Sequence, residues 1–291
     1  MRTLAPVVLA LAASSALAAE PTMKPFVLAS RGPGEAAEVA VEVKARLAKA
    51  GLEVVGTYEP YPGATVLAVT SDEAKATAAR TPAGGYAAAQ RVTVTKVGDE
   101  VQVAYTNPGY MAAAYRLDGD LAGVAKALEA ALGKLEEYGL AEGKTAAQLR
   151  KYHYMVGMEY FDEPSKLGRF GSHEGAVKAV EDGLAAKAGG ASKVYRIDLP
   201  GGEQTVFGVA LTDGCSGDER LMKEIDAKPV RSTGHLPYEL LVAGPNVYAL
   251  YARFRIAVNF PDLKMMGAHS FMNIRCAPDA IEGALKKVSG Q

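Results

Sequence analysis

The feature that most constrains this chain is an internal duplication suggested by two similar stretches. Residues 101–108 alternate apolar and polar side chains and end at a proline, and a similar stretch returns at residues 254–261. Alternation with a period of two predicts a strand with one buried face, and proline closes a strand or lies at its edge because it has no N–H to donate. Two copies of such a strand predict two related halves.

Other correspondences keep the same order along the chain. Residues 43–51, in a predicted helix, correspond to residues 182–189, and Tyr58 corresponds to Tyr195. Chance would scramble this order, so the matches favour a duplication. A chain of 291 residues with 49% hydrophobic residues is also long enough to bury two cores.

Hydrophobic patterns predict the same α+β element order in each half: a strand, a helix, four antiparallel strands and a closing helix. In the first half the closing helix is expected to carry an apolar stripe over residues 121–135 and to end at Gly139. In the second half the last hairpin is expected to pair residues 237–242 with residues 246–258. We predict a first repeat domain at residues 24–139, a linker at residues 140–152 and a second repeat domain at residues 153–291.

The first residues have the pattern of a secretory signal peptide, which we place at residues 1–19. Arg2 provides a basic start, an apolar run extends from Leu4 to Leu11, and small residues around Ala18 offer a cleavage site. The apolar run is shorter than the ~20 residues that a membrane span needs. We therefore predict a soluble periplasmic or secreted protein with no membrane span after removal of the signal. An uncleaved N-terminal anchor is the alternative.

Charge and compartment exclude several classes of partner. Arg2 is the only charged residue in the predicted signal, so 31 basic and 33 acidic residues remain, with no long basic cluster. This balance argues against a nucleic-acid partner. Residues 32–37 match the pattern G-x-G-x-x-A, but hairpins follow in place of alternating helices, and an exported protein has no nicotinamide pool. We interpret the match as a tight turn between a strand and a helix.

Two cysteines, Cys215 and Cys276, lie in the second half. An even number of cysteines in an exported chain favours a disulfide, which would close a loop of about 60 residues and contribute about 4 kcal/mol. Two separate buried thiols are the alternative.

Residues 236–242, 247–251 and 260–261 give the chain a family resemblance. A leucine-proline start, a hydrophobic strand, a turn and an aromatic-rich strand ending near proline resemble the prokaryotic family called domain of unknown function 302. The first half resembles it at residues 101–108, although residues 86–90 stand where the leucine-proline start would be. The resemblance implies two tandem TATA-binding-protein-like domains, each with a curved antiparallel sheet between two helices along the chain. It implies no specific activity.

Methionine and histidine residues gather after residue 150 in two clusters. These candidate metal ligands are His153, Met155 and Met158 in the first cluster, and Met265, Met266, His269 and Met272 in the second. Thioether and imidazole groups suit copper(I), which makes copper the candidate cofactor, and a haem iron is a related alternative. The simpler interpretation is that the methionines fill gaps in a core.

A second candidate site combines aromatic and basic side chains. Tyr248, Tyr251, Arg253 and Arg255 follow one another closely and would suit a cleft for an apolar or anionic ligand. Alternatively, they cover a sheet beneath its helices.

No catalytic arrangement is visible. Ser172, His173 and Glu174 are neighbours in sequence, which does not place a hydroxyl against an imidazole, and no G-x-S-x-G motif occurs. Asp213, Asp218 and Glu219 fit no standard calcium loop. We predict an exported binding or accessory protein with an unknown small ligand or a copper-type metal. The alternatives are a protein–protein interaction module without ligand and an enzyme of unknown reaction.

Overall fold

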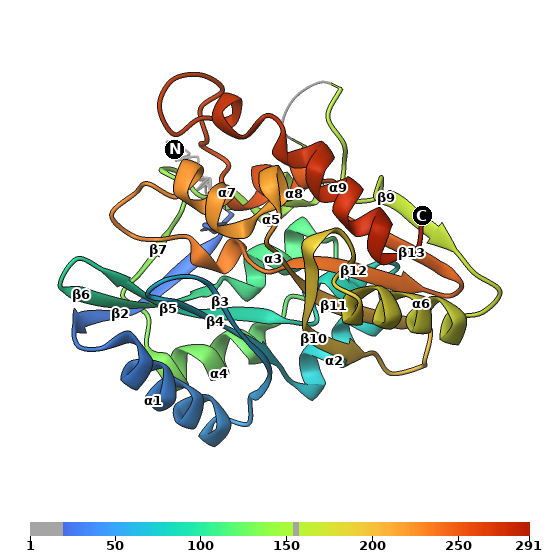
Figure 1. Cartoon of the computed structure of the whole chain (residues 1–291). Coiled ribbons are helices and arrows are strands. Elements are labelled where there is room, and N and C mark those ends of the chain that lie inside the picture. The colour runs from blue at the N-terminus through green and yellow to red at the C-terminus, as the bar shows by residue number, and fades with distance from the viewer. Residues whose placement is uncertain (1–19, 154–156) are drawn as a thin grey trace, which may run out of the picture.

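The computed structural model describes residues 20–153 and 157–291, and its strands form two large antiparallel sheets and a small two-stranded pair (Figure 1). The six-stranded sheet is built from the first half of the chain and the five-stranded sheet from the second half. The mixture of helices and sheets confirms the α+β class. The predicted signal peptide, residues 1–19, and Met155 lie outside the described residues.

The six-stranded sheet has the order β3-β4-β5-β6-β2-β7. Its strands are β2 (Phe26–Pro33), β3 (Glu53–Tyr61), β4 (Ala64–Thr70), β5 (Gln90–Val97), β6 (Glu100–Thr106) and β7 (Glu136–Tyr138). The five-stranded sheet has the order β10-β11-β12-β13-β9. Its strands are β9 (Ser165–Arg169), β10 (Ala191–Asp198), β11 (Gln204–Leu211), β12 (Tyr238–Ala243) and β13 (Asn246–Ala249). The small pair joins β1 (Thr22–Met23) to β8 (Lys144–Thr145).

The two sheets have the same strand order once β7, an added edge strand, is set aside. In each half the second, third, fourth and fifth strands are neighbours in that order, and the first strand pairs with the fifth. The irregularities of pairing also correspond. The register skips Ala29 in β2 and Leu167 in β9, and it shifts before Gly56 in β3 and before Tyr195 in β10. Because such bulges are local features of a strand, their equivalent positions support a relationship between the halves.

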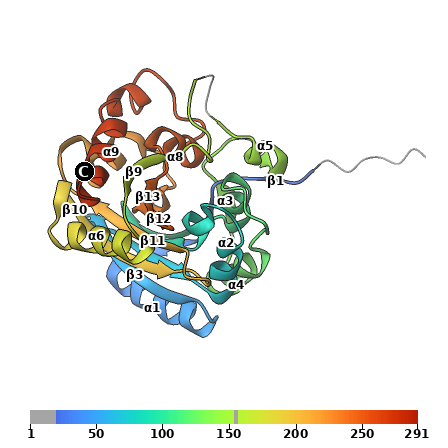
Figure 2. The ribbon, with the colours of Figure 1, turned by 90° about the vertical axis from the view of Figure 1, so that its right-hand side faces the viewer.

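Each sheet has one face covered by helices of its own half (Figures 1 and 2). Helices α1 (Ala36–Lys49) and α4 (Ala122–Leu132) pack on the six-stranded sheet, and α6 (His173–Ala185) and α9 (Ala277–Val288) pack on the five-stranded sheet. Val43 and Leu47 of α1 are buried, as their helical spacing predicts. No helix within the described ranges is long and apolar enough to cross a membrane.

The opposite face of each sheet is covered by a connection from the other half. The turn η1 (Gly84–Ala87), between β4 and β5, packs on β11 and β12, and the turn η4 (Thr233–His235), between β11 and β12, packs on β4, β5 and β6. Gln204 accepts a hydrogen bond from the Gly85 amide at 3.2 Å and donates one to the Thr81 carbonyl at 3.1 Å. The Thr95 and Thr233 hydroxyls hydrogen-bond at 2.9 Å. Each half therefore contributes a connection that packs on the sheet of the other half, and these reciprocal contacts hold the halves together.

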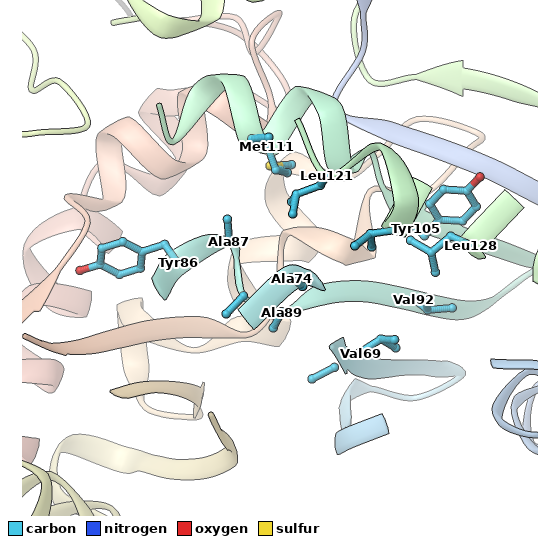
Figure 3. Close-up of a cluster of buried hydrophobic side chains, with 14 of the residues drawn as sticks. Val69, Ala74, Tyr86, Ala87, Ala89, Val92, Tyr105, Met111, Leu121 and Leu128 are labelled. Carbon is cyan, nitrogen blue, oxygen red and sulfur yellow. The ribbon is translucent and has the colours of Figure 1, made fainter. Parts of the chain in front are cut away.

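The larger hydrophobic core therefore crosses the boundary between the halves. It contains the first-half residues shown in Figure 3, among them Tyr86 and Met111, and continues into second-half residues such as Tyr195, Leu241 and Phe254. A second cluster fills the space between the five-stranded sheet and α6 and α9. Since about 25 cal/mol is gained per Å² of buried apolar surface, the shared core ties the stability of each half to the other.

The strand predicted at residues 254–261 is wrong. Strand β13 ends at Ala249, and helix α8 (Ala252–Asn259) follows it. Nearly all side chains of α8 are buried, so the sequence shows no polar face with helical spacing. A short segment buried on all sides cannot be assigned to helix or strand from periodicity alone. In the order of elements, α8 corresponds to α3 (Pro108–Ala114), which follows β6 and was also not predicted.

The closing helix of the first half is shorter than predicted. Helix α4 ends at Leu132, because Gly133 adopts a φ of 96°, and Leu135 is exposed outside the helix. Additional helices interrupt the simple element order. They are α2 (Asp72–Ala79), α5 (Ala146–Arg150) in the predicted linker, and α7 (Asp218–Ile225).

Candidate functional site

The structure brings only part of the predicted methionine and histidine clusters together. Met158 and Met265 line one small apolar pocket of about 20 Å³ with Phe260 and Phe271. Within the described residues, no three histidine, cysteine, aspartate or glutamate side chains gather as a metal site would require. The observed pocket thus contains two thioethers among apolar neighbours.

The other predicted metal ligands that the structure describes are not among the residues that line this pocket. Met266 and Met272 are exposed at the surface. The exposed His269 has its Nδ1 atom 3.0 Å from the Glu224 carbonyl oxygen. The His153 ring stacks on Tyr160 with the centroids 4.3 Å apart, and it lines a separate hollow.

The predicted aromatic and basic site is not a single cleft. Tyr248 lines a hollow beside β9, whereas Arg253 lines the apolar pocket and forms an ion pair with Glu159. Arg255 is 1% exposed and pairs with Glu239, and Tyr251 is half-buried at the start of α8. Arg255 is therefore part of the core between the halves and is not accessible to a ligand.

The most developed polar site is a groove between the end of β3 and helix α7, which we call the inter-half groove. It consists of two hollows that share Glu219 and Lys223. The first, of about 350 Å³, is also lined by Tyr61, Pro62, Thr95, Lys96, Met222, Asp226 and Arg231. The second, of about 460 Å³, is also lined by Tyr58, Glu59, Pro60, Leu211, Thr212, Gly214, Gly217, Asp218, Arg220 and Glu224. Both halves of the chain contribute walls, and volumes of this size suit a small molecule.

The first wall of the groove depends on an irregular strand end. In a regular strand, side chains three positions apart point to opposite faces. The register of β3 shifts between Tyr58 and Tyr61, around Pro60, and both tyrosine rings pack against the core of the second half. The Tyr58 phenol reaches Asp218 of α7, and the Tyr61 phenol reaches Thr233 of η4.

The second wall is the amphipathic helix α7. Leu221, Met222 and Ile225 are buried on one face, which fixes the helix against the second core. An aspartate lies at each end: Asp218 is the first residue of the helix, and Asp226 follows its last residue. The spacing places two carboxylates at the two ends of the groove.

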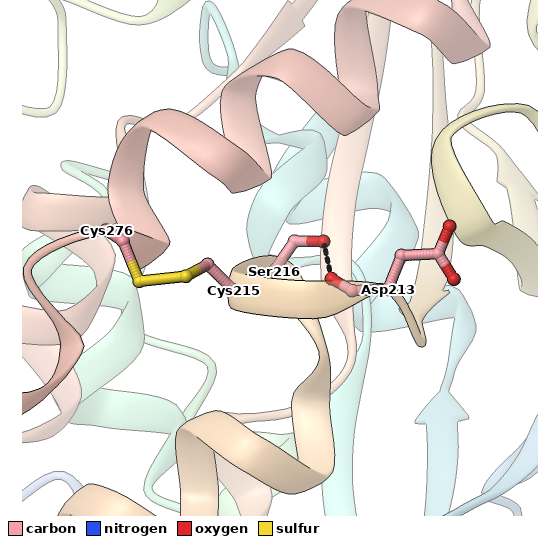
Figure 4. The surroundings of a disulfide bond; sticks show 4 residues. All are labelled: Asp213, Cys215, Ser216 and Cys276. Atoms are coloured by element: carbon pink, nitrogen blue, oxygen red, sulfur yellow. Dashed lines mark hydrogen bonds between the residues drawn. A yellow bond between two sulfur atoms is a disulfide. The ribbon is translucent and has the colours of Figure 1, made fainter.

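The disulfide anchors the start of α7. Cys215 lies in the turn η3 (Gly214–Ser216), just before the helix, and is bonded to Cys276 at the start of α9, as predicted (Figure 4). In the same turn, the Ser216 hydroxyl donates to the Asp213 carbonyl oxygen at 2.7 Å. The bond therefore holds one end of the groove to a helix of the second core.

Asp218 is buried and paired with a tyrosine of the other half. Its Oδ2 atom accepts hydrogen bonds from the Leu211 amide at 2.8 Å and from the Tyr58 hydroxyl. Burial raises the pKa of Asp218 to about 7, although these two hydrogen bonds lower it in part. Burial and the neighbouring Asp218 also raise the pKa of Tyr58. The Asp218 carboxyl therefore titrates near neutral pH, while the Tyr58 phenol keeps its proton.

Asp226 has a similar environment at the other end. Its two carboxylate oxygens accept from the Ser232 amide at 2.9 and 3.0 Å, and burial raises its pKa to about 7. The Arg231 side chain donates to the Asp226 backbone carbonyl. Nearby, the Tyr61 and Thr233 hydroxyls hydrogen-bond at 2.8 Å, and burial raises the pKa of Tyr61 to about 12. This end combines a titratable carboxyl with fixed hydroxyl and guanidinium groups.

Sequence reasoning did not identify the residues that form this groove. Asp218 and Glu219 were considered as calcium ligands, but Asp218 points to Tyr58 and is 2% exposed. The amphipathic pattern of residues 218–226 was a usable signal for α7. No local pattern indicated that tyrosines 160 residues earlier would reach it. Comparisons with protein-family models, curated proteins and solved structures found no match to this chain.

Proposed function

We propose that this protein is an exported binding protein that holds a small polar ligand in the inter-half groove. The observation that carries the proposal is the position of the groove, with hydroxyl, carboxyl and basic side chains from both halves converging on one concavity. Ligand sites commonly combine a preformed concavity with a few polar groups that set orientation. Groups with pKa values shifted by burial are also concentrated at functional sites.

The disulfide supports the proposed location. Disulfides persist in oxidising compartments such as the periplasm or the extracellular space, and Cys215–Cys276 fastens an element of the groove. The predicted signal peptide remains a sequence-based prediction. The resemblance to the domain of unknown function 302 family, with its TATA-binding-protein-like fold, likewise remains a proposal, and it agrees with the equivalent strand orders of the two sheets.

A thermal-shift screen of small polar metabolites tests the proposal. The expected result is stabilisation of the protein by at least one compound, with loss of the effect in Lys223→Met. The matched control is Lys228→Met, because Lys228 is also an exposed lysine next to α7 but pairs with Asp262 outside the groove. Ligand effects that persist unchanged in Lys223→Met and in Tyr61→Phe would contradict the assignment of the groove.

A soft-metal site is the second candidate function. It is favoured by the shared pocket of Met158 and Met265, since thioethers suit copper(I). Titration with copper(I) under reducing conditions should give binding that weakens in Met158→Leu and Met265→Leu. Met272→Leu should bind as the unmodified protein, because the exposed Met272 does not line the pocket. Equal binding by all three variants would exclude this pocket as the site.

A further inference from the structure

The 350 Å³ hollow of the inter-half groove has an excess of basic side chains. Lys96, Lys223 and Arg231 line it together with one exposed carboxylate, Glu219, and the 4% exposed Asp226. The lining therefore carries a net charge of +2 when Asp226 is protonated and +1 when it is ionised. Opposite charges within a partly enclosed cavity interact more strongly than in bulk water.

The basic groups come from three separate places in the fold. Lys96 lies on β5, where its Nζ atom donates to the Gly34 carbonyl at 2.7 Å and lies 3.8 Å from the exposed Glu35 carboxylate. Lys223 lies on α7, and Arg231 lies on the connection that covers the six-stranded sheet, where its amide donates to Gln102 at 3.0 Å. Convergence of cations from both halves on one hollow distinguishes it from an ordinary solvated face.

Hydroxyl groups complete the set of donors. Tyr61 and Thr95 line the same hollow, and both contact the Thr233 hydroxyl, at 2.8 and 2.9 Å. Basic groups together with hydroxyl groups match the acceptor oxygens of a carboxylate, phosphate or sulfate.

Asp226 lines the same hollow, and its carboxylate repels a bound anion only when it is ionised. Its carboxyl is surrounded by Tyr61 of β3, Tyr138 of β7, Lys223 and Glu219 of α7, and Lys228 and Arg231 of the following connection. A protonated carboxyl removes one negative charge from the hollow and adds an O–H donor.

We propose that the ligand of this hollow is a small oxyanion and that its binding is accompanied by protonation of Asp226. The inference rests on the proposed function of the inter-half groove and adds the chemical class of its ligand. Lys223, Lys96 and Arg231 hold the anionic oxygens, and Asp226 couples affinity to pH. By linkage, the anion binds more tightly as the pH falls, and bound anion favours the protonated carboxyl.

The test uses sulfate and acetate as probes, because neither changes its charge between pH 6 and pH 8. With a pKa of about 7, Asp226 is about nine-tenths protonated at pH 6 and about one-tenth at pH 8. The affinity measured by calorimetry should fall by up to about tenfold over this range. Tighter binding of sulfate would indicate a phosphate-like ligand, and tighter binding of acetate a carboxylate.

Two variants separate the parts of the proposal. Asp226→Asn should bind the anion with nearly the same affinity at pH 6 and pH 8, and Lys223→Met should bind it more weakly at both. Lys178→Met removes an exposed lysine that pairs with Asp182 away from the hollow, and it should behave as the unmodified protein. Absence of binding by both anions, or a pH dependence retained in Asp226→Asn, would overturn the inference. If neutral compounds still bind and depend on Lys223, the proposed function survives and only the oxyanion class fails.

Discussion

Arg91 of β5 and Glu239 of β12 form an ion pair between the two halves with both side chains almost completely buried. They occupy corresponding positions, since each lies near the start of the fourth strand of its sheet. Glu239 also accepts from the Tyr195 hydroxyl at 2.8 Å and lies 3.5 Å from the Arg255 guanidinium. Two guanidinium groups thus depend on one buried carboxylate.

We expect Glu239→Gln to destabilise the protein by about 3–5 kcal/mol. The substitution leaves Arg91 and Arg255 without their shared counter-charge in a site that water does not reach. Urea unfolding measures the change. The control is Glu181→Gln, because Glu181 pairs with Lys193 and Arg196 at the surface and its loss should cost less than about 1 kcal/mol. Equal effects of the two substitutions would contradict a structural role for the buried cluster.

Gly208→Ala should also weaken the junction between the halves. A Cβ atom at Gly208 would lie 2.1 Å from the Tyr195 ring, so the ring that reaches Glu239 must move. We expect a loss of about 1–3 kcal/mol from this overpacking, measured by thermal or urea unfolding. Gly283→Ala is the control, because the added Cβ meets no atom within 4 Å and alanine favours the helix by up to about 1 kcal/mol. A neutral Gly208→Ala would show that Tyr195 tolerates displacement.

The stability of the protein should contain a component that falls as the pH rises towards 7. Burial raises the pKa values of Asp218 and Asp226 to about 7 from an ordinary value of 3.8, so the folded state binds more protons than the unfolded state between these values. Their contribution is fully present below about pH 4 and is lost as the pH rises through 7. Asp226→Asn should therefore gain stability relative to the unmodified protein at pH 8 but not at pH 4.

Chemical unfolding of both proteins at several pH values measures this difference. The expected gain at pH 8 is on the order of a few kcal/mol. A constant difference across the whole range would mean that Asp226 titrates at its ordinary pKa when folded.

Removal of the disulfide should loosen the groove as well as the fold. The bond links residues 61 positions apart, and the chain-entropy relation gives about 4 kcal/mol for a loop of this length. Because Cys215 immediately precedes α7, we expect the double substitution Cys215→Ser and Cys276→Ser to accelerate amide hydrogen exchange most in α7. Uniform acceleration in both halves would indicate that the bond stabilises the fold without positioning the groove.

The sequence predicted those parts of the fold that have one solvated face. Helix α1 has a polar face opposite Val43 and Leu47, and the hairpin of β5 and β6 joins at a glycine turn, so both were recognisable from periodicity. Helix α8 was missed because it is buried on all sides. The disulfide was predicted from the even number of cysteines and the proposed compartment, and it is confirmed.

The candidate site was less predictable because it is formed by long-range contacts. Arginine is a common ligand-binding residue, which is why Arg255 was predicted as part of a binding site. In the structure, Arg255 pairs with the buried Glu239 and is itself buried, so no ligand can reach it. Tyr58 and Asp218 acquire their shared environment only when the strand end of one half meets a helix of the other. A site formed by contacts between residues far apart in the sequence can be identified only from the three-dimensional structure.

Amide hydrogen exchange in sulfate, compared with chloride at the same ionic strength and at pH 6, tests most directly the claim that the inter-half groove binds an oxyanion. The account predicts slower exchange in the amides of residues 218–226 and around Tyr61, and little change elsewhere. Unchanged exchange in these residues, with protection confined to the apolar pocket near Met158 and Met265, would contradict it.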